Sequence, residues 1–490
     1  MLHTITEFVT KTITGFSSWT LLIILLALAV FNPYIASFIA IYYAVFFAVR
    51  SIWFFFGVIS TFRKTQEYTN INWFSRCRSL AGFEKVHHLV VVPTYKEGWS
   101  ILYRTFLCLA SSNYPLQNVS ICLATEASDE TAASVVKKVK EHFDGRFANL
   151  FITTHTLTPE EAAGKGSNQA YAVKAVQQQL LDQGHLKKNI LVTSLDADYR
   201  MHSEYLGHLS YQYLSQRDSN CRIFQPIPMF FNNIWKAPFF SRITVTFALQ
   251  WFMAQLTMPD ELVNFSCYAL SLELLENAGY WDPAIIQEDS RLYWKVFFTV
   301  GEKLKVIPLY IPMYGNAVCS DSFTSTLVSQ YKQIKRWAWG VTDFPYVVQN
   351  AITHKEICPY TRTKRVILLF FTHLNWATLP MIILFGTSFI SFVNPAFSAT
   401  VLSYNLAYFS SKIFSVSLVF LLAFIVIAEL FLYPPKPSHW SFLRKQSTLL
   451  HWLAIPFVGI ILGAFPALDS QTQSMVGKKL LYQVSPKGEE

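Results

Sequence analysis

Two acidic residues separated by a single position follow a short apolar run in the middle of the chain. Residues 190–195 have the composition of a buried strand, and Asp196-Ala197-Asp198 comes at its end. Two carboxylates in this place can share one divalent cation, Mg²⁺ or Mn²⁺, together with phosphate oxygens that the cation bridges. Such a cation neutralises a diphosphate group as its bond breaks. Because similar acidic pairs also occur in solvated turns, Asp196 and Asp198 alone indicate only a candidate metal site.

A second acidic pair lies further along the chain. Glu288 and Asp289 follow Gln287 and precede residues 290–300, which have helical patterning. Either carboxylate can act as a general base that takes the proton of an acceptor hydroxyl. Acidic residues are also favoured at a helix N-terminus by the macrodipole, so a purely structural role stays open.

A basic and aromatic set forms the third candidate for chemistry. Gln333, Arg336 and Trp337 lie on one amphipathic segment, in the order Gln-Ile-Lys-Arg-Trp. The planar guanidinium of Arg336 suits phosphate oxygens, and the flat face of Trp337 suits stacking against a sugar ring. An interfacial helix with ordinary aromatic and basic anchors is the alternative, but it does not explain this set.

Short apolar runs alternate with polar-faced helical segments between about residues 85 and 316. The expected strands are residues 88–93, 119–124, 150–154 and 190–195, and the expected helices between them are residues 99–110, 130–142 and 166–182. This alternation is typical of βαβ units with a mostly parallel sheet. Ligands of such sheets bind beyond the carboxyl ends of the strands, where the first acidic pair lies.

The two ends of the chain are far more apolar than this middle part. Hydrophobic residues make up 52% of the 490 residues and charged residues only 14%, whereas about a quarter of an ordinary soluble domain is charged. Residues 18–60 are long enough for a hairpin of two spanning helices with a turn near 32–37, and further spans are expected at about 366–392 and 406–432.

The charge distribution gives an orientation for these spans. Four basic residues follow the second expected helix: Arg63, Lys64, Arg76 and Arg78. Because cytoplasmic segments are enriched in Lys and Arg, this end of the helix is expected on the cytoplasmic side. The net charge of +9 suits anionic headgroups, and no basic stripe with interleaved aromatic residues indicates nucleic-acid binding. The sequence therefore predicts a multi-pass protein of the plasma (inner) membrane with a cytoplasmic central domain and no nucleic-acid partner.

These features together resemble glycosyltransferase family 2, the inverting GT-A enzymes that include cellulose synthase, hyaluronan synthase and ceramide glucosyltransferase. The family has five sequence markers in a fixed order: a Pro-Thr-x-x-Glu turn, an acidic residue after the second strand, a DxD motif, a Glu-Asp pair and a QxxRW motif. They correspond here to Pro93, Thr94 and Glu97, to Glu126, to Asp196 and Asp198, to Glu288 and Asp289, and to Gln333, Arg336 and Trp337. The resemblance covers about residues 85–340.

The resemblance implies a fold and a role for each of these residues. The fold is an α/β GT-A domain (Rossmann-like, of the nucleotide-diphospho-sugar transferase type) flanked by transmembrane helices. The donor nucleotide would be bound by Pro93, Thr94, Glu97, Glu126, Lys165 and Asp196. Asp198 and Asp196 would hold the divalent cation, Asp289 beside Glu288 would be the base, and Gln333, Arg336 and Trp337 would shape the diphosphate and acceptor sites.

The chain departs from the family pattern at three positions. Glu126 stands in Ala-Thr-Glu-Ala-Ser where the family has an aspartate, Gln287 replaces a threonine, and Lys96 replaces an asparagine before Glu97. These departures bear on recognition of the nucleotide base and leave the metal and base positions unchanged.

The C-terminal tail carries one more likeness. Tyr482, Val484, Ser485 and Lys487 resemble the FxVTxK gating loop of the cellulose synthase branch. A cytoplasmic gating loop requires an even number of crossings after the catalytic domain, so residues 449–467 would be re-entrant or interfacial. The unbroken hydrophobicity of this stretch favours a full span instead, and both interpretations stay open.

The resemblance divides the chain into five parts with one expected reaction. The parts are a transmembrane hairpin (1–62), the catalytic domain (63–325), interfacial helices (326–365), a second transmembrane region (366–470) and the tail (471–490). The expected reaction is inverting transfer from a nucleotide-sugar donor, a UDP-sugar, to a growing β-linked polysaccharide, in contact with membrane lipid. Transfer of one sugar to a lipid and an inactive scaffold or transporter are the alternatives, and accessory secretion proteins are not identifiable from the sequence.

Overall fold

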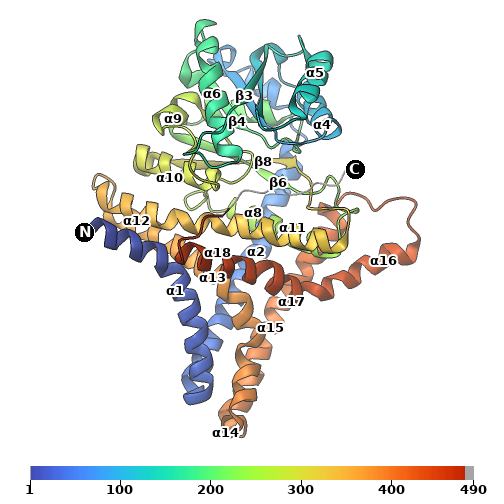
Figure 1. The fold of residues 1–490 in the computed structure, drawn as a ribbon. Helices are drawn as coiled ribbons and strands as arrows, with labels where there is room; N and C mark the ends of the chain where they lie inside the picture. Colours follow the sequence, from blue (N-terminus) through green and yellow to red (C-terminus); the bar gives the residue numbers. More distant parts are fainter. Residues whose placement is uncertain (1, 481–490) are drawn as a thin grey trace.

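Eight strands form one mixed sheet in the upper part of the molecule (Figure 1). The computed structural model describes residues 2–480. The strands are β1 (His87–Pro93), β2 (Val119–Glu126), β3 (Asn149–His155), β4 (Ile190–Ser194), β5 (Arg200–Met201), β6 (Arg222–Met229), β7 (Ala269–Ser271) and β8 (Lys305–Tyr314). Their order across the sheet is β3-β2-β1-β4-β7-β6-β8-β5.

The first half of the sheet has the predicted βαβ form. Strands β1 to β4 pair in parallel, and the helices between them are α4 (Trp99–Ala110), α5 (Ala132–Phe143) and α6 (Lys165–Asp182). Every residue of β1, β2 and β4 is buried, as expected for strands covered on both faces. The predicted strands and helices of this half are confirmed to within two residues at each end.

The second half adds short antiparallel pairs to a sheet that is mostly parallel, as predicted. Strand β7 runs antiparallel to both β4 and β6, and β5 runs antiparallel to β8, so that only β6 and β8 pair in parallel there. The long helix α8 (Phe239–Gln255) and an irregular segment separate β6 from β7, so β7 is not the product of a βαβ crossover. The sheet is therefore mixed.

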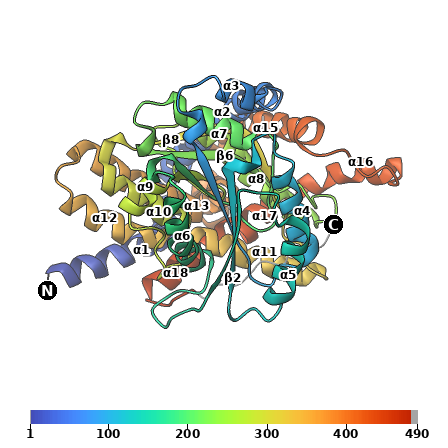
Figure 2. The same cartoon turned by 90° about the horizontal axis from the view of Figure 1, so that it is seen from above.

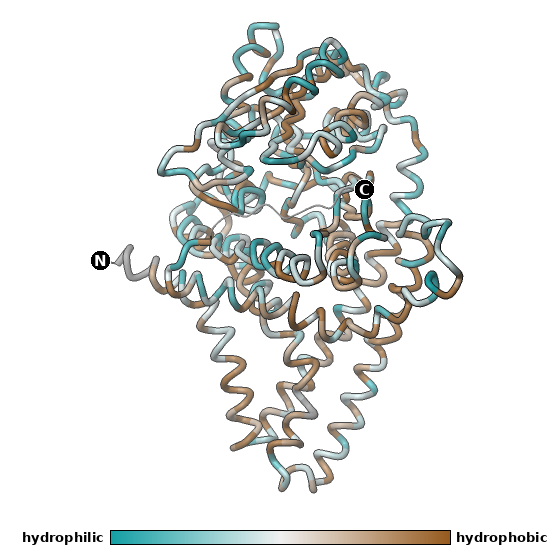
Figure 3. The backbone as a smooth tube through the Cα atoms, turned by 45° about the vertical axis from the view of Figure 1, so that its right-hand side comes forward, coloured by the Kyte–Doolittle hydropathy of each residue, from teal (hydrophilic) through white to brown (hydrophobic). Residues whose placement is uncertain are grey.

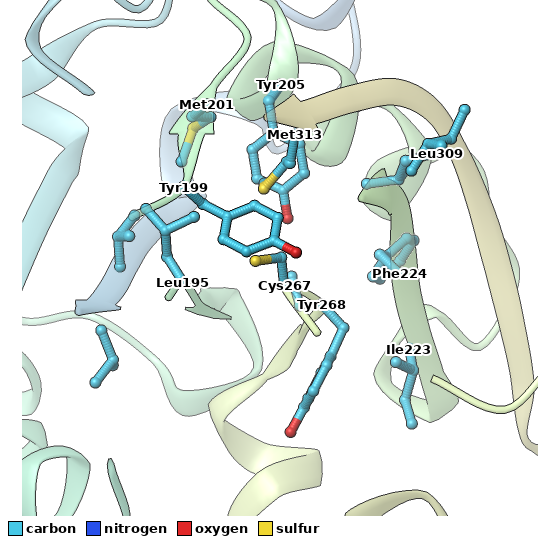
Figure 4. Packing of buried hydrophobic residues seen from close by; sticks show 14 of the residues in the cluster. Leu195, Tyr199, Met201, Tyr205, Ile223, Phe224, Cys267, Tyr268, Leu309 and Met313 are labelled. Atoms are coloured by element: carbon cyan, nitrogen blue, oxygen red, sulfur yellow. The ribbon is translucent and has the colours of Figure 1, made fainter. Parts of the chain in front are cut away.

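A cluster of buried side chains fixes the loop that leaves β4. Tyr199, Tyr205, Tyr268 and Cys267 lie close together between β4 and β6 (Figure 4), and each is at most 2% exposed. A Cβ added to Gly315 would lie 2.7 Å from the ring of Tyr199, so the backbone after β8 presses directly on this ring. The residues just before Tyr199 are therefore held by dense packing rather than by a mobile loop.

Long apolar helices project from the side of the molecule opposite the sheet. They are α1 (Leu2–Phe31), α2 (Pro33–Tyr68), α13 (Pro359–Val393) and α15 (Val401–Ile427), and their hydrophobic residues stand out in Figure 3. Within residues 2–480, five helical segments are long and apolar enough to cross a membrane, the fifth being Phe442–Met475. The expected hairpin turn is found at Asn32, whose side chain caps α2 by accepting from the amide of Ile35.

A layer of helices lies crosswise between the sheet and the projecting helices (Figure 1). It contains α11 (Phe323–Ala338), α12 (Asp343–Thr353), α16 (Phe442–Leu450), α17 (Ile455–Val458) and α18 (Phe465–Met475). Helix α18 packs against α11 and α1, and Ser470 Oγ donates to the carbonyl of Lys335 at 2.6 Å. Residues 449–467, for which a span and an interfacial position were both open, lie in this crosswise layer.

Candidate functional site

The carboxyl end of β4 carries the first acidic pair in two different settings. Asp196 keeps 26% of its side chain exposed, and its Oδ2 accepts from Ser266 Oγ at 2.7 Å. Asp198 is 3% exposed, and its Oδ2 accepts from the backbone amide of Asn316 at 3.0 Å. The structure thus leaves Asp196 partly exposed beside Ser266 and anchors Asp198 against the end of β8.

Lys165 joins this pair to the second acidic pair. The residue begins α6, and its Nζ lies 2.7 Å from Asp196 Oδ1 and 3.6 Å from Asp289 Oδ1. Burial lowers the pKa of Lys165, but the carboxylates of Asp196, Asp289 and Glu288 outweigh burial and hold that pKa well above its usual value. The ammonium group of Lys165 therefore lies between the candidate metal ligand Asp196 and the candidate base Asp289.

Glu288 and Asp289 form the first turn of α10 (Glu288–Val300). Burial raises the pKa of Asp289, while the nearby charge of Lys165 lowers it in part. Burial, and then the charge of Asp289, also raise the pKa of Glu288. The backbone carbonyl of Asp289 accepts from Asn264 Nδ2 at 3.0 Å. A carboxylate with a raised pKa holds an abstracted proton more firmly, which suits a general base.

The approach of α6 to α10 depends on a glycine. A Cβ added to Gly166 would lie 2.8 Å from the Cβ of Glu288 and 3.5 Å from the carbonyl oxygen of Asp282. The first contact is shorter than real side chains show, so a glycine is required at this position. Because Lys165 precedes this glycine, the close contact also sets the position of the Lys165 ammonium group relative to Asp289.

An ion pair connects α10 to the crosswise layer. Arg291 Nε donates to Asp343 Oδ1 at 2.7 Å, and Ser290 Oγ donates to Asp343 Oδ2 at 2.5 Å. Asp343 is completely buried, and Gln287 Nε2 donates to Thr342 Oγ1 just before it. Residues on both sides of Glu288 and Asp289 are thus fixed to residues 342–343. Asp343 had no role in the sequence interpretation.

The Gln-Ile-Lys-Arg-Trp set lies in the last two turns of α11. The charge of Arg336 lowers the pKa of Glu288, against the stronger effect of burial. The ring of Trp337 lies 5.8 Å from that of Phe230, which follows β6, and Gln333 Oε1 accepts from Gln330 Nε2 at 3.0 Å. The structure therefore brings Arg336 to the acidic cluster.

The predicted nucleotide-binding turn follows β1. Pro93 ends that strand, and the amide of Thr94 donates to the carbonyl of Ala124 at 2.8 Å. Glu97 Oε2 accepts from Thr94 Oγ1 at 3.0 Å and from the amide of Tyr95. Glu97 thus stabilises its own turn. Lys96 has a φ of 63°, a conformation in which asparagine is more frequent than lysine.

A second turn, after β2, holds a residue that the sequence interpretation missed. Glu126 ends β2 and is buried, and this burial raises its pKa. Asp129 Oδ2 accepts from the amide of Lys96 at 2.7 Å, while its Oδ1 accepts from the amide and the hydroxyl of Thr131. Asp129 therefore joins the turns after β1 and β2. An aspartate two residues before a threonine, ahead of a helix, was the available signal.

Two carboxylates at the end of β4, those of Asp196 and Asp198, could hold a cation. Within residues 2–480, no set of three or more His, Cys, Asp and Glu side chains is arranged to hold a metal ion. Asp196 and Asp198 nevertheless fit a magnesium or manganese ion, since these ions often take one or two carboxylates and complete their coordination with phosphate oxygens and water. The tail residues Tyr482, Val484, Ser485 and Lys487 lie outside the described residues.

An α/β core with a mixed sheet, acidic residues at the carboxyl end of β4, a buried carboxylate at the start of α10 and an Arg-Trp pair at the end of α11 has the arrangement of a GT-A glycosyltransferase domain. The family described as "Glycosyl transferase family group 2" matches residues 191–432. The matched residues belong to a family 2 glycosyltransferase domain, and the activity of this domain uses a nucleotide-sugar donor. The matched stretch contains both acidic pairs and the Gln-Ile-Lys-Arg-Trp set, and it begins after the Pro93 and Glu126 turns.

Two solved structures illustrate the comparisons. A mannosyltransferase from Pyrobaculum calidifontis, in complex with GDP-Man and Mn²⁺, is 15% identical, covers 78% of this chain and 98% of its own, and has a TM-score of 0.44. TarS 1–349 of S. aureus, in complex with UDP-GlcNAc, is 12% identical, covers 80% of this chain and 93% of its own, and has a TM-score of 0.37. The comparison with curated proteins gave no match.

Proposed function

We propose that this glycosyltransferase inverts the anomeric carbon and that Asp289 is its general base. The observation that carries the proposal is the position of Lys165, whose ammonium group contacts both Asp196 and Asp289. One cation can touch both carboxylates only if the end of β4 and the start of α10 line the same site. A donor phosphate near Asp196 and an acceptor hydroxyl near Asp289 would then meet across a few ångströms.

The proposed reaction is a single displacement. The acceptor oxygen attacks the anomeric carbon from the face opposite the diphosphate, and the Asp289 carboxylate receives the hydroxyl proton. The bond from the anomeric carbon to the diphosphate oxygen breaks, and its electron pair leaves with the nucleoside diphosphate. The configuration inverts, so an α-linked donor gives a β-linked product. Orientation by the protein supplies a large part of the rate.

Positive charge from the chain would stabilise the leaving group. Arg336 and Lys165 are the cationic groups at the acidic cluster, and each favours an anion that develops there. Asp196 and Asp198 would hold a divalent cation, Mg²⁺ or Mn²⁺, which supplies further charge neutralisation for the diphosphate. Trp337 and Gln333 are proposed to shape the acceptor site, and Thr94, Glu97 and Glu126 the nucleotide site.

Replacing Asp289 by Asn tests the base. Removal of a general base typically lowers turnover by about 10²- to 10⁴-fold, and we expect release of nucleoside diphosphate from the purified, membrane-reconstituted enzyme to fall by this amount. Asp260→Asn is the matched control, because Asp260 is 81% exposed and pairs only loosely with Lys305 at 3.8 Å. Normal turnover of Asp289→Asn would refute the assignment.

The donor and the cation are tested with the same assay. UDP-glucose, UDP-GlcNAc, UDP-galactose and GDP-mannose are offered in turn, and we expect a UDP-sugar to be used. Removal of divalent cations should abolish turnover, and added Mg²⁺ or Mn²⁺ should restore it. Activity that survives exhaustive chelation would refute the assignment of a divalent cation to Asp196 and Asp198.

We further propose a growing β-linked polysaccharide as the acceptor, with catalysis on the cytoplasmic side of the plasma (inner) membrane. The resemblance of the tail to a gating loop supports this acceptor. A lipid acceptor is the second candidate, favoured by the position of α11 in the layer from which the apolar helices project (Figure 1). Product size after incubation with labelled donor separates the two, because a polymer gives a ladder and a glycolipid a single species.

A further inference from the structure

Helix α16 stands out from the rest of the molecule. It lies at the outer edge of the crosswise layer, beyond the helices that cover the sheet (Figures 1 and 2). Its neighbours along the chain are the end of α15 on one side and α17 on the other. The apolar helices begin to project from the molecule at the level of this crosswise layer (Figure 1).

One face of α16 is attached to the protein by polar contacts. Lys436 Nζ donates to Thr448 Oγ1 at 2.8 Å and to the carbonyl of Lys445 at 3.0 Å. The same ammonium group pairs with Glu429 at 2.9 Å, and Glu429 also accepts from Trp452 Nε1 at 3.0 Å. Glu429 keeps 7% of its side chain exposed. A largely buried ion pair therefore fixes the face of α16 that carries Thr448.

The opposite face of α16 is apolar and uncovered. At about 100° per residue, Phe442, Leu443, Leu449 and Leu450 fall within an arc of about 120° that excludes Thr448. The exposed Gln446 lies at the centre of this arc and is its one polar residue. Phe442 is 73% exposed and Leu443 is 78% exposed. An amphipathic helix with such a stripe lies in the plane of a membrane interface rather than across the membrane.

Basic and aromatic residues flank this stripe. Arg444 lies over the ring of Trp440 at 4.3 Å, and Lys445 follows it. No acidic residue occurs between Pro434 and Leu453. Tryptophan and basic side chains are the residues that anchor proteins at the headgroup level. A second copy of this chain would bring the same positive charge to the stripe and is therefore disfavoured as its partner.

We propose that α16 docks on an anionic membrane surface, with its apolar stripe in the acyl boundary and Arg444 and Lys445 on lipid phosphates. It follows that Phe442–Met475 is an interfacial strap and does not cross the membrane, although it is long and apolar enough to do so. The crossings after the sheet domain are then α13 and α15, which leaves α18 on the catalytic side. The proposal rests on membrane insertion of the projecting helices and is independent of the reaction chemistry.

Site-directed photo-crosslinking in the full chain tests this contact. A benzophenone amino acid replaces Leu443, and the enzyme is placed in nanodiscs of equal parts phosphatidylglycerol and phosphatidylcholine. We expect a lipid adduct by intact mass, with phosphatidylglycerol enriched about fivefold, since one basic residue near an anionic surface contributes about this factor. The matched control is the same substitution at Gln178, exposed on α6, which should give no adduct.

Each other outcome counts against part of the proposal. A crosslinked polypeptide at Leu443, or no lipid adduct, would overturn docking on the membrane. The double variant Arg444→Glu, Lys445→Glu should retain adducts but lose the enrichment, whereas Lys137→Glu, Lys138→Glu on α5 should keep it. Unchanged enrichment in the first variant would overturn recognition of anionic headgroups. The variants Val476→Cys and Gln178→Cys are each treated with an impermeant maleimide on one side of the membrane. If the two cysteines are labelled from opposite sides, the strap Phe442–Met475 crosses the membrane and the proposal is wrong.

Discussion

Gly166→Ala adds one carbon atom at the point where α6 meets α10. The new Cβ would lie 2.8 Å from the Cβ of Glu288, and ordinary carbon contacts need at least about 0.7 Å more. Glu288 cannot move its Cβ without moving the backbone of α10, so the two helix ends must separate. An overpacked contact of this kind typically costs about 1–3 kcal/mol.

The intrinsic preference of a helix for alanine opposes this cost. Alanine in place of glycine contributes about 1 kcal/mol in a helix interior, and less at the second residue of α6. The net effect on the free energy of unfolding is therefore a loss of up to about 2 kcal/mol. Activity should suffer more, because a displacement approaching 1 Å at a catalytic site can cost about 10²-fold in rate. Lys165 and Asp289 are the groups that this separation moves apart.

The assay is release of nucleoside diphosphate by the reconstituted enzyme, with thermal unfolding measured in parallel. We expect kcat to fall about 10- to 100-fold while the unfolding temperature drops by a few degrees. Gly459→Ala is the control, because a Cβ there meets nothing within 4 Å, and it should leave kcat unchanged. If Gly166→Ala has normal kcat, the contact with Glu288 does not set the geometry of the site.

Three further predictions concern the same site. Asp343→Asn removes the nearer carboxylate from buried Arg291, which keeps Asp282 at 3.5 Å. We expect the free energy of unfolding to fall by up to about 3–5 kcal/mol, as measured by denaturant unfolding; a loss below about 1 kcal/mol would contradict the role of the pair. Glu97→Ala removes the acceptor that holds the turn after β1 and should raise KM for the donor about tenfold, with kcat nearly unchanged. Burial raises the pKa of Asp289, and the base works only when ionised, so kcat should fall as pH decreases through that pKa. Lys165→Met removes a charge that lowers this pKa and should move the acidic limb of the kcat profile to higher pH; an unmoved limb would argue against Asp289 as base.

The half of the sheet that the sequence predicts is the half with unbroken apolar strands. β1, β2 and β4 are buried on both faces, so they read as continuous apolar runs. β6 and β8 each contain two prolines, which normally exclude a strand from the interior of a sheet. Their pairing includes a register shift between Gln225 and Ile227 that accommodates the missing donors. β5 and β7 are too short, at two and three residues, to leave a pattern.

For the candidate site too, the sequence predicts one part, the motif residues, and not another, the contacts between them. The motif residues were found because their types and order are informative without any structure. Lys165 was placed near the nucleotide, but its contacts with Asp196 and Asp289 depend on how closely α6 approaches α10. Asp343 belongs to no motif, because its role comes from the helical turn Trp339–Thr342, which places the start of α12 against Arg291. Contacts of this kind are set by tertiary packing and leave no periodicity in the sequence.

The contact of α18 with α1 has a consequence for biosynthesis. Ser18 Oγ donates to Gln471 Oε1 at 2.6 Å, across a separation of 453 residues, and Lys335, next to Arg336, pairs with Asp469 on the same helix at 2.6 Å. A ribosome makes α1 and α11 long before α18 emerges. The contacts of α18 with α11, next to Arg336, therefore form late. A nascent chain that already carries both acidic pairs still lacks these contacts.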